Sequence, residues 1–286
     1  MRLLATSDLH FNHPRSRQGA IEIISHINSL QFDALLLLGD TAITEGSHLE
    51  DCLNLFTFRG PRLFVAGNHE LWTKGGDSHE LLTVQLPERV EAAGWHWLES
   101  HPFVQGDAAI VGSVGWYDYG FTVPHLGIPK RFYEAKISPG AAERHAEFSR
   151  LFEHTDDIGS IARETVARWN DGRFVRLGRS DEAFLEERLG NMERQLESLR
   201  QVPRVLVATH HVPFAELMPP PSAPQWDFAK AFLGSPRIGE LIRRYPNVQT
   251  VLAGHTHMPA EARVGGIRAI DIGGGYRATR YVIVDV

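Results

Sequence analysis

Seven short apolar runs limit how this chain can fold more than any other feature of its sequence. Each is almost continuous in small or branched apolar residues, and in chain order they read RLLATSD, FDALLLLGD, RLFVAGN, AAIVGSVGW, RVLVATH, VQTVLAGH and YVIVDV. A strand with one face in water alternates apolar and polar residues, whereas unbroken runs are typical of strands buried on both faces. The sequence therefore predicts buried strands that are covered by helices.

Helical periodicity separates the strand-like runs at both ends of the chain. Between the first two runs, the apolar residues that recur at helical spacing are Ala20, Ile23, Ile24, Ile27 and Leu30. Near the other end, Ser235 and Pro236 suit the N-cap and first position of a helix that continues through Ile238. This alternation of strand and helix predicts a layered α/β fold.

The middle of the chain departs from that alternation. We expect residues 1–286 to form a single domain, in which residues 117–200 are a largely helical insertion or cap. Ser180 and Asp181 give a helix start signal, and the apolar stripe that follows them predicts a long helix covering the core.

Three aromatic residues at the entry to this segment allow two interpretations. Trp116, Tyr117 and Tyr119 either pack between the sheet and the cap or line a pocket. Packing is the use that large aromatic side chains most often serve.

Composition and charge narrow the class of protein. The 286 residues are 43% hydrophobic and 22% charged, which is ordinary for a soluble globular protein, and the formal net charge of -6 gives no basic field for nucleic acid. The single cysteine, Cys52, excludes a disulfide within the chain. We find no stretch apolar enough for a signal peptide or membrane span, and therefore expect a cytoplasmic protein without a membrane partner.

Residues of the kinds that bind metal ions stand at the end of five of the seven runs. They are Asp8 and His10, then Asp40, then Asn68, His69 and Glu70, then His210 and His211, and finally His255 and His257. A single aspartate at a strand end is usually a turn former or a helix cap. Because open α/β sheets form ligand crevices at the carboxyl ends of their strands, the ordered set predicts one shared site.

Spacing suggests how these side chains point. Asp8 and His10 are separated by one residue, as are His255 and His257. Residues at alternate positions of an extended backbone point to the same side, so we expect each pair to act as a chelate. Neighbouring residues point to opposite sides, so His210 and His211 are not expected to share one task.

The order Asp-x-His, Gly-Asp, Gly-Asn-His-Glu, His and Gly-His-x-His resembles the calcineurin-like metallophosphoesterase superfamily. The five blocks are present as DLH, GD, GNHE, HH and GHTH, and they span Asp8 to His257. The resemblance implies a four-layer αββα sandwich, in which two mixed β-sheets pack face to face with helices outside. The residue pattern alone predicts the α/β class and the ligands at strand ends, but not the second sheet.

The same resemblance implies two divalent metal ions and assigns their ligands. It puts Asp8, His10 and His257 on one ion, Asn68, His210 and His255 on the other, and Asp40 between them. Carboxylate, amide and imidazole ligands without a thiolate suit manganese, iron, cobalt or zinc, and manganese is our first expectation.

The implied activity is hydrolysis of a small soluble phosphate ester, as a phosphatase or a phosphodiesterase. Two cations can activate a hydroxide that attacks phosphorus in line. His69 is then a catalytic residue rather than a ligand, which acts beside Asn68 and Asp40 by stabilising the transition state or protonating the leaving oxygen. Glu70 is either a hydrogen-bonded support for a ligand or for His69, or a surface or N-cap carboxylate.

Two other functions compete with this interpretation. A nuclease of the same superfamily would need a basic track, and the sequence shows none, so we do not expect a nucleic-acid partner. A non-catalytic metal-binding scaffold would tolerate the loss of ligand residues, yet all five blocks are intact. The sequence does not separate monoesters from diesters, and it does not predict an oligomeric state.

Overall fold

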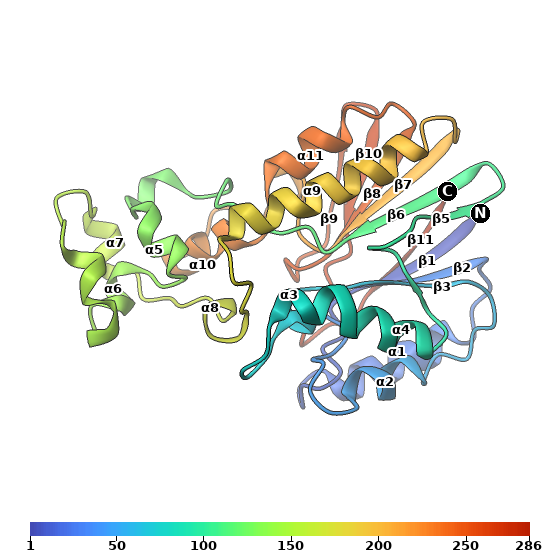
Figure 1. Ribbon diagram of the computed structural model, residues 1–286, viewed down its shortest axis with the longest axis horizontal. Helices are drawn as coiled ribbons and strands as arrows, with labels where there is room; N and C mark the ends of the chain where they lie inside the picture. The colour runs from blue at the N-terminus through green and yellow to red at the C-terminus, as the bar shows by residue number, and fades with distance from the viewer.

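Two mixed β-sheets lie face to face at the centre of the structure, a computed structural model that describes residues 1–286 (Figure 1). The first sheet has the order β11 (Tyr281–Asp285), β1 (Arg2–Thr6), β2 (Ala34–Leu38), β3 (Arg62–Val65) and β4 (His96–Trp97). The second has the order β5 (Phe103–Gln105), β6 (Ala108–Ser113), β7 (Arg204–Thr209), β8 (Val248–Ala253), β10 (Ile267–Asp271) and β9 (Ala260–Val264). Strands β1 to β4 are parallel, as are β6, β7, β8 and β10, while the edge strands β11, β5 and β9 are antiparallel.

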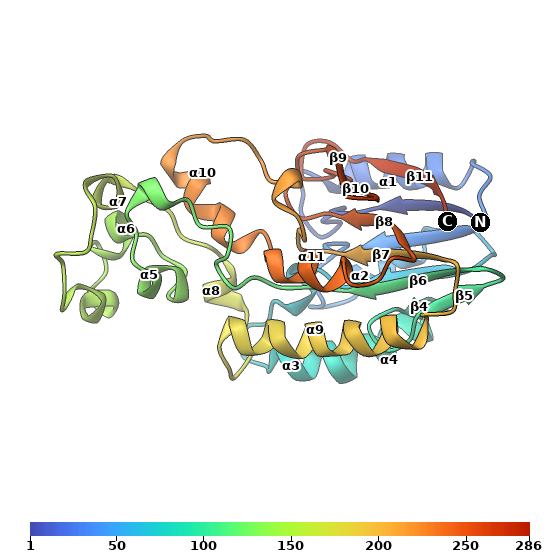
Figure 2. The ribbon, with the colours of Figure 1, turned by 90° about the horizontal axis from the view of Figure 1, so that it is seen from above.

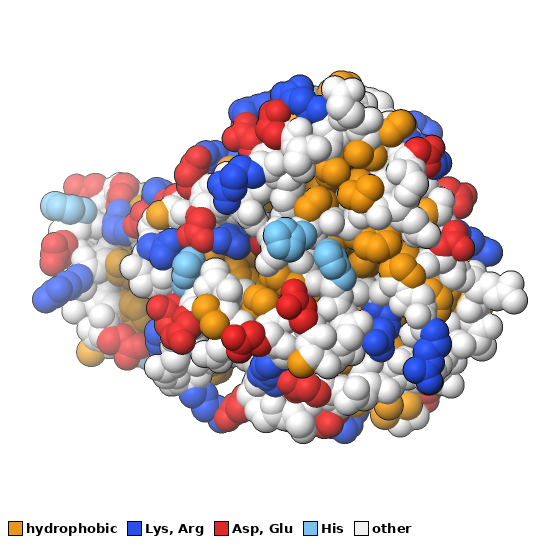
Figure 3. Space-filling model, turned by 45° about the vertical axis from the view of Figure 1, so that its right-hand side comes forward, with side chains coloured by type: hydrophobic (Ala, Val, Ile, Leu, Met, Phe, Trp, Pro, Cys, Tyr) orange, Lys and Arg blue, Asp and Glu red, His pale blue; other side chains and the backbone are white.

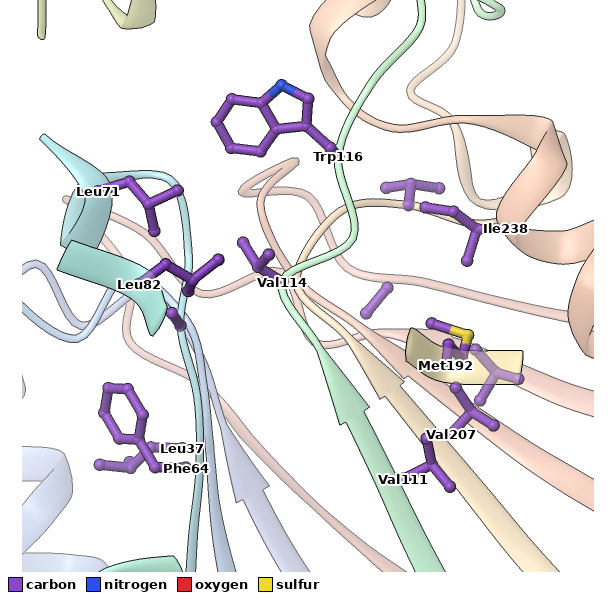
Figure 4. Packing of buried hydrophobic residues seen from close by; sticks show 14 of the residues in the cluster. Leu37, Phe64, Leu71, Leu82, Val111, Val114, Trp116, Met192, Val207 and Ile238 are labelled. Carbon is purple, nitrogen blue, oxygen red and sulfur yellow. The ribbon is translucent and has the colours of Figure 1, made fainter. Parts of the chain in front are cut away.

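Alternate residues of each central strand serve two different cores. The residues between the sheets include Leu3, Ala5, Leu36, Leu38, Leu63, Val65, Ile110, Leu206, Ala208 and Leu252. Their neighbours face the helices, and Figure 4 shows Leu37 and Phe64 of the first sheet and Val111 and Val207 of the second in that larger cluster. Both faces of these strands are therefore apolar, which explains why the runs do not alternate.

Helices cover the outer face of each sheet, which confirms the expected four-layer αββα sandwich. On the first sheet lie α1 (Arg17–Ile27), α2 (His48–Leu53), α3 (Ser78–Glu80) and α4 (Leu86–Ala92), and on the second lie α9 (Asp181–Ser198) and α11 (Pro236–Ile242) (Figure 1). The α9 helix begins where the sequence indicates, because the Ser180 side chain accepts a hydrogen bond from the Ala183 N–H. None of the helices combines the length and hydropathy that crossing a bilayer requires.

Residues 117–200 form two structurally different parts. The short helices α5 (Lys130–Glu134), α6 (Pro139–Ala142), α7 (Ser160–Glu164) and α8 (Asp171–Phe174) make a lobe with its own small core, beyond the end of the sheets that lies opposite the chain termini (Figures 1 and 2). Helix α10 (Pro224–Ala229) lies beside this lobe (Figure 2). Helix α9 instead packs on the second sheet, as expected of a core-covering helix.

The aromatic residues at the entry to the lobe are packed rather than exposed. Trp116, Tyr117 and Tyr119 are buried, and the Trp116 ring lies 4.6 Å from that of Tyr117 and 5.1 Å from that of Phe184 on α9. The packing interpretation is therefore confirmed, and these rings join the lobe to the second sheet.

Gly112 in β6 provides a test of how closely the two sheets approach. A Cβ at this position would lie 2.4 Å from the Leu98 Cβ and 2.6 Å from the Val65 Cγ2. Because overfilling a close-packed core costs about 1–3 kcal/mol, we expect Gly112→Ala to lower the free energy of unfolding in urea by that amount. Gly190→Ala in α9 is the control: it meets only an Arg194 side chain at 3.6 Å and should stabilise the protein by up to about 1 kcal/mol. Equal stabilities of the two variants would contradict the predicted close contact.

Candidate metal centre

Strands of both sheets bring the predicted ligands to one place. Asp8 and His10 follow β1, Asp40 follows β2, Asn68 follows β3, His210 follows β7, and His255 and His257 follow β8. The carboxyl ends of these strands face the lobe (Figure 2). All seven are buried except His257, whose side chain is 33% exposed.

The first group of ligands comprises Asp8, His10, Asp40 and His257, whose potential ligand atoms all lie within 4.8 Å of one another. The Nε2 atoms of His10 and His257 are 3.0 Å apart. His257 Nε2 is 3.4 Å from an Asp8 carboxylate oxygen, and His10 Nε2 is 3.8 Å from Asp40 Oδ2. This geometry brings together two carboxylates and two imidazoles.

The second group is built around His210 Nε2. This atom lies 3.4 Å from Asp40 Oδ1, 3.3 Å from Asn68 Oδ1 and 3.1 Å from His255 Nδ1. Asp40, His210 and His255 also meet the 4.8 Å criterion as a group. Asp40 thus takes part in both groups, with Oδ2 directed to the first and Oδ1 to the second.

Hydrogen bonds to backbone carbonyls fix which ring nitrogen is free in the second group. His210 Nδ1 donates to the Leu38 carbonyl at 3.2 Å, and His255 Nε2 donates to the Phe232 carbonyl at 3.3 Å. These tautomers leave His210 Nε2 and His255 Nδ1 as acceptors that face the oxygens of Asn68 and Asp40. Several buried acceptors face one another here, and none of them has a hydrogen to donate to the others. A cation between them would satisfy them, so these residues fit a divalent metal ion.

The charge state of the site also supports a bound cation. Burial lowers the pKa of His10 to about 3, so this ring is neutral, as ligation requires. Burial opposes ionisation of Asp40, yet His69 and His210 hold the pKa of that carboxyl well below its usual range. Burial also disfavours charged His210, but Asp40 raises its pKa to about 10, so without a metal ion the carboxylates favour a proton on this ring, and a bound cation would take the place of that proton.

The backbone of the ligands corrects the expectation that was drawn from their spacing. Extended strands do not direct the pairs, because Asp8, His10, His255 and His257 have φ angles of 56°, 41°, 73° and 57°, and Asp40 has 52°. These five are among only seven non-glycine residues with positive φ. Left-handed backbone of this kind costs about 1–3 kcal/mol per residue and gathers at functional sites.

His69 lies beside the ligand groups without belonging to either. Its Nε2 is 3.7 Å from Asp40 Oδ2, and its backbone N–H donates to Asp40 Oδ1 at 2.9 Å. The ring stacks on Trp72, with centroids 3.7 Å apart and planes at 25°. His69 is therefore held next to the shared carboxylate, with 12% of its side chain exposed to the cavity that it lines.

Glu70 is a hydrogen-bonded support, and the surface alternative is wrong. Its side chain is fully buried and accepts bonds of 2.6–3.0 Å from the backbone N–H groups of Asp40, Thr41, Ala42 and Gly67. One carboxylate therefore binds the loop after β2 to the loop after β3, and in doing so it positions Asp40.

His211 is separated from its neighbour as the sequence predicts. Its Nδ1 donates to the Val114 carbonyl at 2.8 Å, and it belongs to neither ligand group. The ring lies 4.5 Å from that of His255 and 4.9 Å from that of Trp116. His210 thus faces the ligands, while His211 packs behind them.

Several residues of the site escaped the sequence analysis. A cavity of about 760 Å³ lies over both groups, and Trp72, Trp169, Trp226 and Tyr276 are among the residues that line it. Tyr276 stacks on His10, with ring centroids 4.1 Å apart. Glycine pairs or runs stand near two of these residues, at 75–76 after Trp72 and at 273–275 before Tyr276, but no periodicity in the sequence marks the aromatic side chains.

Comparisons with known proteins identify a matching family and similar folds. A family model described as "Calcineurin-like phosphoesterase" matches residues 1–259. The phosphopantetheinyl hydrolase from Mycobacterium tuberculosis has a similar structure, with 22% identity, a TM-score of 0.67, and coverage of 99% of this chain and 96% of its own. A dimetal phosphatase from Danio rerio has 14% identity, a TM-score of 0.51, and coverage of 99% and 91%. A search of curated proteins found no match.

The Glu70 support can be tested through stability. In Glu70→Gln an NH₂ group replaces one carboxylate oxygen, so two buried backbone N–H groups lose their acceptor. Because each such loss costs about 1–3 kcal/mol, we expect the free energy of unfolding of the metal-free protein to fall by about 2–6 kcal/mol in urea. Glu91→Gln, on an exposed glutamate of α4, is the control and should leave the stability unchanged. A Glu70→Gln protein as stable as this control would show that the four bonds contribute little.

The two adjacent histidines give a second test. We expect His210→Ala to lose the metal ion of the second group, because it removes the nitrogen at the centre of that group. His211→Ala should retain both ions, at a cost in stability for the buried cavity it creates. The measurement is elemental analysis after reconstitution with manganese and removal of free metal. Equal metal loss from both variants would contradict the division of the pair.

Proposed function

The chain belongs to the calcineurin-like phosphoesterase family and is a metal-dependent phosphoesterase; on that premise we propose that the clustered ligands hold two divalent metal ions and serve the hydrolysis of a small phosphate ester. The observation that carries the proposal is the Asp40 carboxylate, which takes part in both ligand groups beneath one cavity.

We assign the ligands as the two groups suggest. One ion would be held by Asp8, His10 and His257, the other by Asn68, His210 and His255, and Asp40 would contact both. The donor set of carboxylate, amide and imidazole supports manganese as the first choice and also suits iron, zinc or cobalt. Such ions, when bound, neutralise the charge of a phosphate ester and lower the pKa of water.

The chain's own contribution to the chemistry centres on His69. The Trp72 stack and the hydrogen bond from its backbone N–H to Asp40 fix this residue at the cavity wall. From there the imidazole can donate a hydrogen bond to a charged phosphate oxygen or a proton to the leaving oxygen. Asp40 and Asn68 complete the set of catalytic residues that we propose.

The cavity supports a small-molecule substrate. Its volume of about 760 Å³ is within the usual range of about 300–1,000 Å³ for small ligands. Lys230, which contributes to its lining, is already engaged by Asp227 at 2.7 Å and by the Pro220 carbonyl at 2.9 Å. Aromatic and proline side chains also line the cavity and can contact the part of the ester that carries no phosphate.

The net charge of -6 and the face shown in Figure 3 favour a small ester over nucleic acid. On the face shown in Figure 3, lysine and arginine side chains are interspersed with aspartate and glutamate rather than gathered in a track. A nuclease relies on an extended basic surface along the phosphate backbone. We therefore keep the nuclease and scaffold functions only as outcomes of the test below.

We propose that residues 1–286 are one domain and that the lobe within 117–200 acts as its cap. Support comes from Arg168, Trp169 and Asn170 of the lobe, which line the cavity. The single buried cysteine, Cys52, is the reason to propose the cytoplasm as the compartment.

One more specific substrate belongs in the test. The structurally similar protein from Mycobacterium tuberculosis is described as a phosphopantetheinyl hydrolase. That likeness shows the fold alone, so we propose a phosphopantetheinyl diester as a candidate to be compared with simple aryl esters.

The function is tested by assaying bis-aryl phosphate, mono-aryl phosphate and a phosphopantetheinyl diester with manganese, iron, cobalt and zinc. We expect hydrolysis with at least one metal. His69→Ala should lower kcat about 10²–10⁴-fold, as loss of a general acid does, while metal content stays normal. Asp40→Ala should lose both activity and metal, since its two oxygens contact both groups.

Three outcomes would contradict the proposal. Absence of hydrolysis with every metal would favour the scaffold. Unimpaired turnover of a poor leaving group by His69→Ala would remove that residue from the chemistry. Efficient, salt-sensitive cleavage of oligonucleotides would favour the nuclease.

A further inference from the structure

Asp171 is a buried carboxylate in the lobe that belongs to neither ligand group. It begins α8 and is 1% exposed. Its Oδ1 accepts hydrogen bonds from Asn68 Nδ2 at 2.8 Å and Trp72 Nε1 at 2.7 Å, and its Oδ2 accepts from Trp169 Nε1 at 2.8 Å and the Tyr117 hydroxyl at 3.1 Å. Four donors fill the capacity of a carboxylate, so the group acts purely as an acceptor.

A second buried aspartate in the same region shows what is unusual about Asp171. Asp181 also accepts from aromatic donors, Trp116 Nε1 and the Tyr119 hydroxyl, but it is paired in addition with the Lys136 ammonium at 2.5 Å. Asp171 is held by neutral donors alone. Burying a carboxylate without a cationic partner costs free energy, so we looked for a role of Asp171 other than packing.

The contact with Asn68 supplies that explanation. An asparagine side chain has an accepting oxygen and a donating NH₂ group of nearly the same shape, and only its partners decide which way the amide points. Because Asp171 can only accept, it binds the NH₂ group and directs Asn68 Oδ1 toward His210 Nε2, 3.3 Å away. The flipped amide would oppose two acceptors and point its NH₂ group at the ligands.

The same oxygen of Asp171 holds the aromatic support of His69. Trp72 donates to Oδ1 through its indole N–H, and its ring stacks on His69 at 3.7 Å. A single carboxylate from the lobe thus fixes the orientation of one ligand and the ring beneath the proposed catalytic histidine.

We propose that Asp171 is a positioning residue, whose acceptor character sets the orientation of the Asn68 amide and thereby the affinity of the second metal group. The inference rests on the proposed two-metal site and adds to it a residue from outside the five sequence blocks. It also gives the lobe a task in building the site, beyond covering it.

The test is a calorimetric titration of the metal-free chain with manganese, in which no substrate is present. Asp171→Asn keeps the shape of the side chain but replaces one oxygen with an NH₂ group, so an indole N–H loses its acceptor whichever way the new amide turns, and the Asn68 amide keeps at most a neutral acceptor. Outer hydrogen-bond partners of metal ligands typically contribute about 10–100-fold to affinity, and we expect a loss of that size for the ion of the second group.

Exchanging the asparagine and the aspartate between positions 68 and 171 distinguishes an effect on the orientation of the ligand from a general loss of stability. Asn68→Asp alone places two carboxylates against each other and should weaken manganese binding, although a carboxylate is the better ligand for this ion. In Asn68→Asp/Asp171→Asn the new amide can donate to the new carboxylate, although Trp72 then loses its acceptor, and binding should recover at least about tenfold relative to Asn68→Asp alone. The same change at Asp171 thus weakens binding beside asparagine and strengthens it beside aspartate.

Asp181→Asn is the matched control. It alters a buried aspartate of the same region that also accepts from aromatic donors, but it does not touch Asn68. We expect lower stability in urea and an unchanged manganese titration. Should Asp171→Asn fail to fold, the comparison of Asn68→Asp with the double variant still decides the question.

Each remaining outcome overturns the inference. Unchanged affinity in Asp171→Asn, equal loss in Asp181→Asn, or further weakening in the double variant would each reduce Asp171 to a structural residue while leaving the proposed function intact. A wild-type chain that binds no manganese would overturn the manganese assignment and this inference together. The manganese titration of the wild-type chain therefore tests the proposed metal site, whereas the titrations of the variants test the positioning role of Asp171.

Discussion

The rest of the site depends on the two oxygens of the Asp40 carboxylate. One faces His10 and the other faces His210, so the two ligand groups cannot move independently. Glu70 binds the backbone N–H of Asp40, and Asp40 in turn accepts from the backbone N–H of His69. Burying these charges among acceptors costs free energy unless cations balance them, so metal binding and the folding of these loops are coupled.

The sequence predicts the chemistry of the site better than its shape. Residue types mark the side chains that the structure gathers into two potential ligand groups. Unbroken apolar runs mark the buried strands, because each central strand faces helices on one side and the other sheet on the second. A one-residue spacing does not specify backbone conformation. The left-handed turn at Asp8 and His10 is held by backbone bonds to Gly39 and Asp40 on the neighbouring strand end, which are set by tertiary structure.

Glu70 and Asp171 show two further limits of the sequence. Glu70 lies inside a recognisable block, yet its burial depends on a loop about thirty positions away that supplies most of its donors. Asp171 lies 103 residues from Asn68, in a stretch with neither helical nor strand periodicity to place it. The sequence marked residues 117–200 as an insertion, and only the fold brings one of its carboxylates to the ligands.

This contact between lobe and ligands limits how the site can change. Trp169 lines the cavity and donates to the same carboxylate that orients Asn68. A change in the lobe that moved Asp171 would also disturb the hydrogen bonds to Asn68 and Trp72. Because a buried polar network is costly when one of its members loses a partner, Asp171 couples the cavity wall to the candidate metal centre.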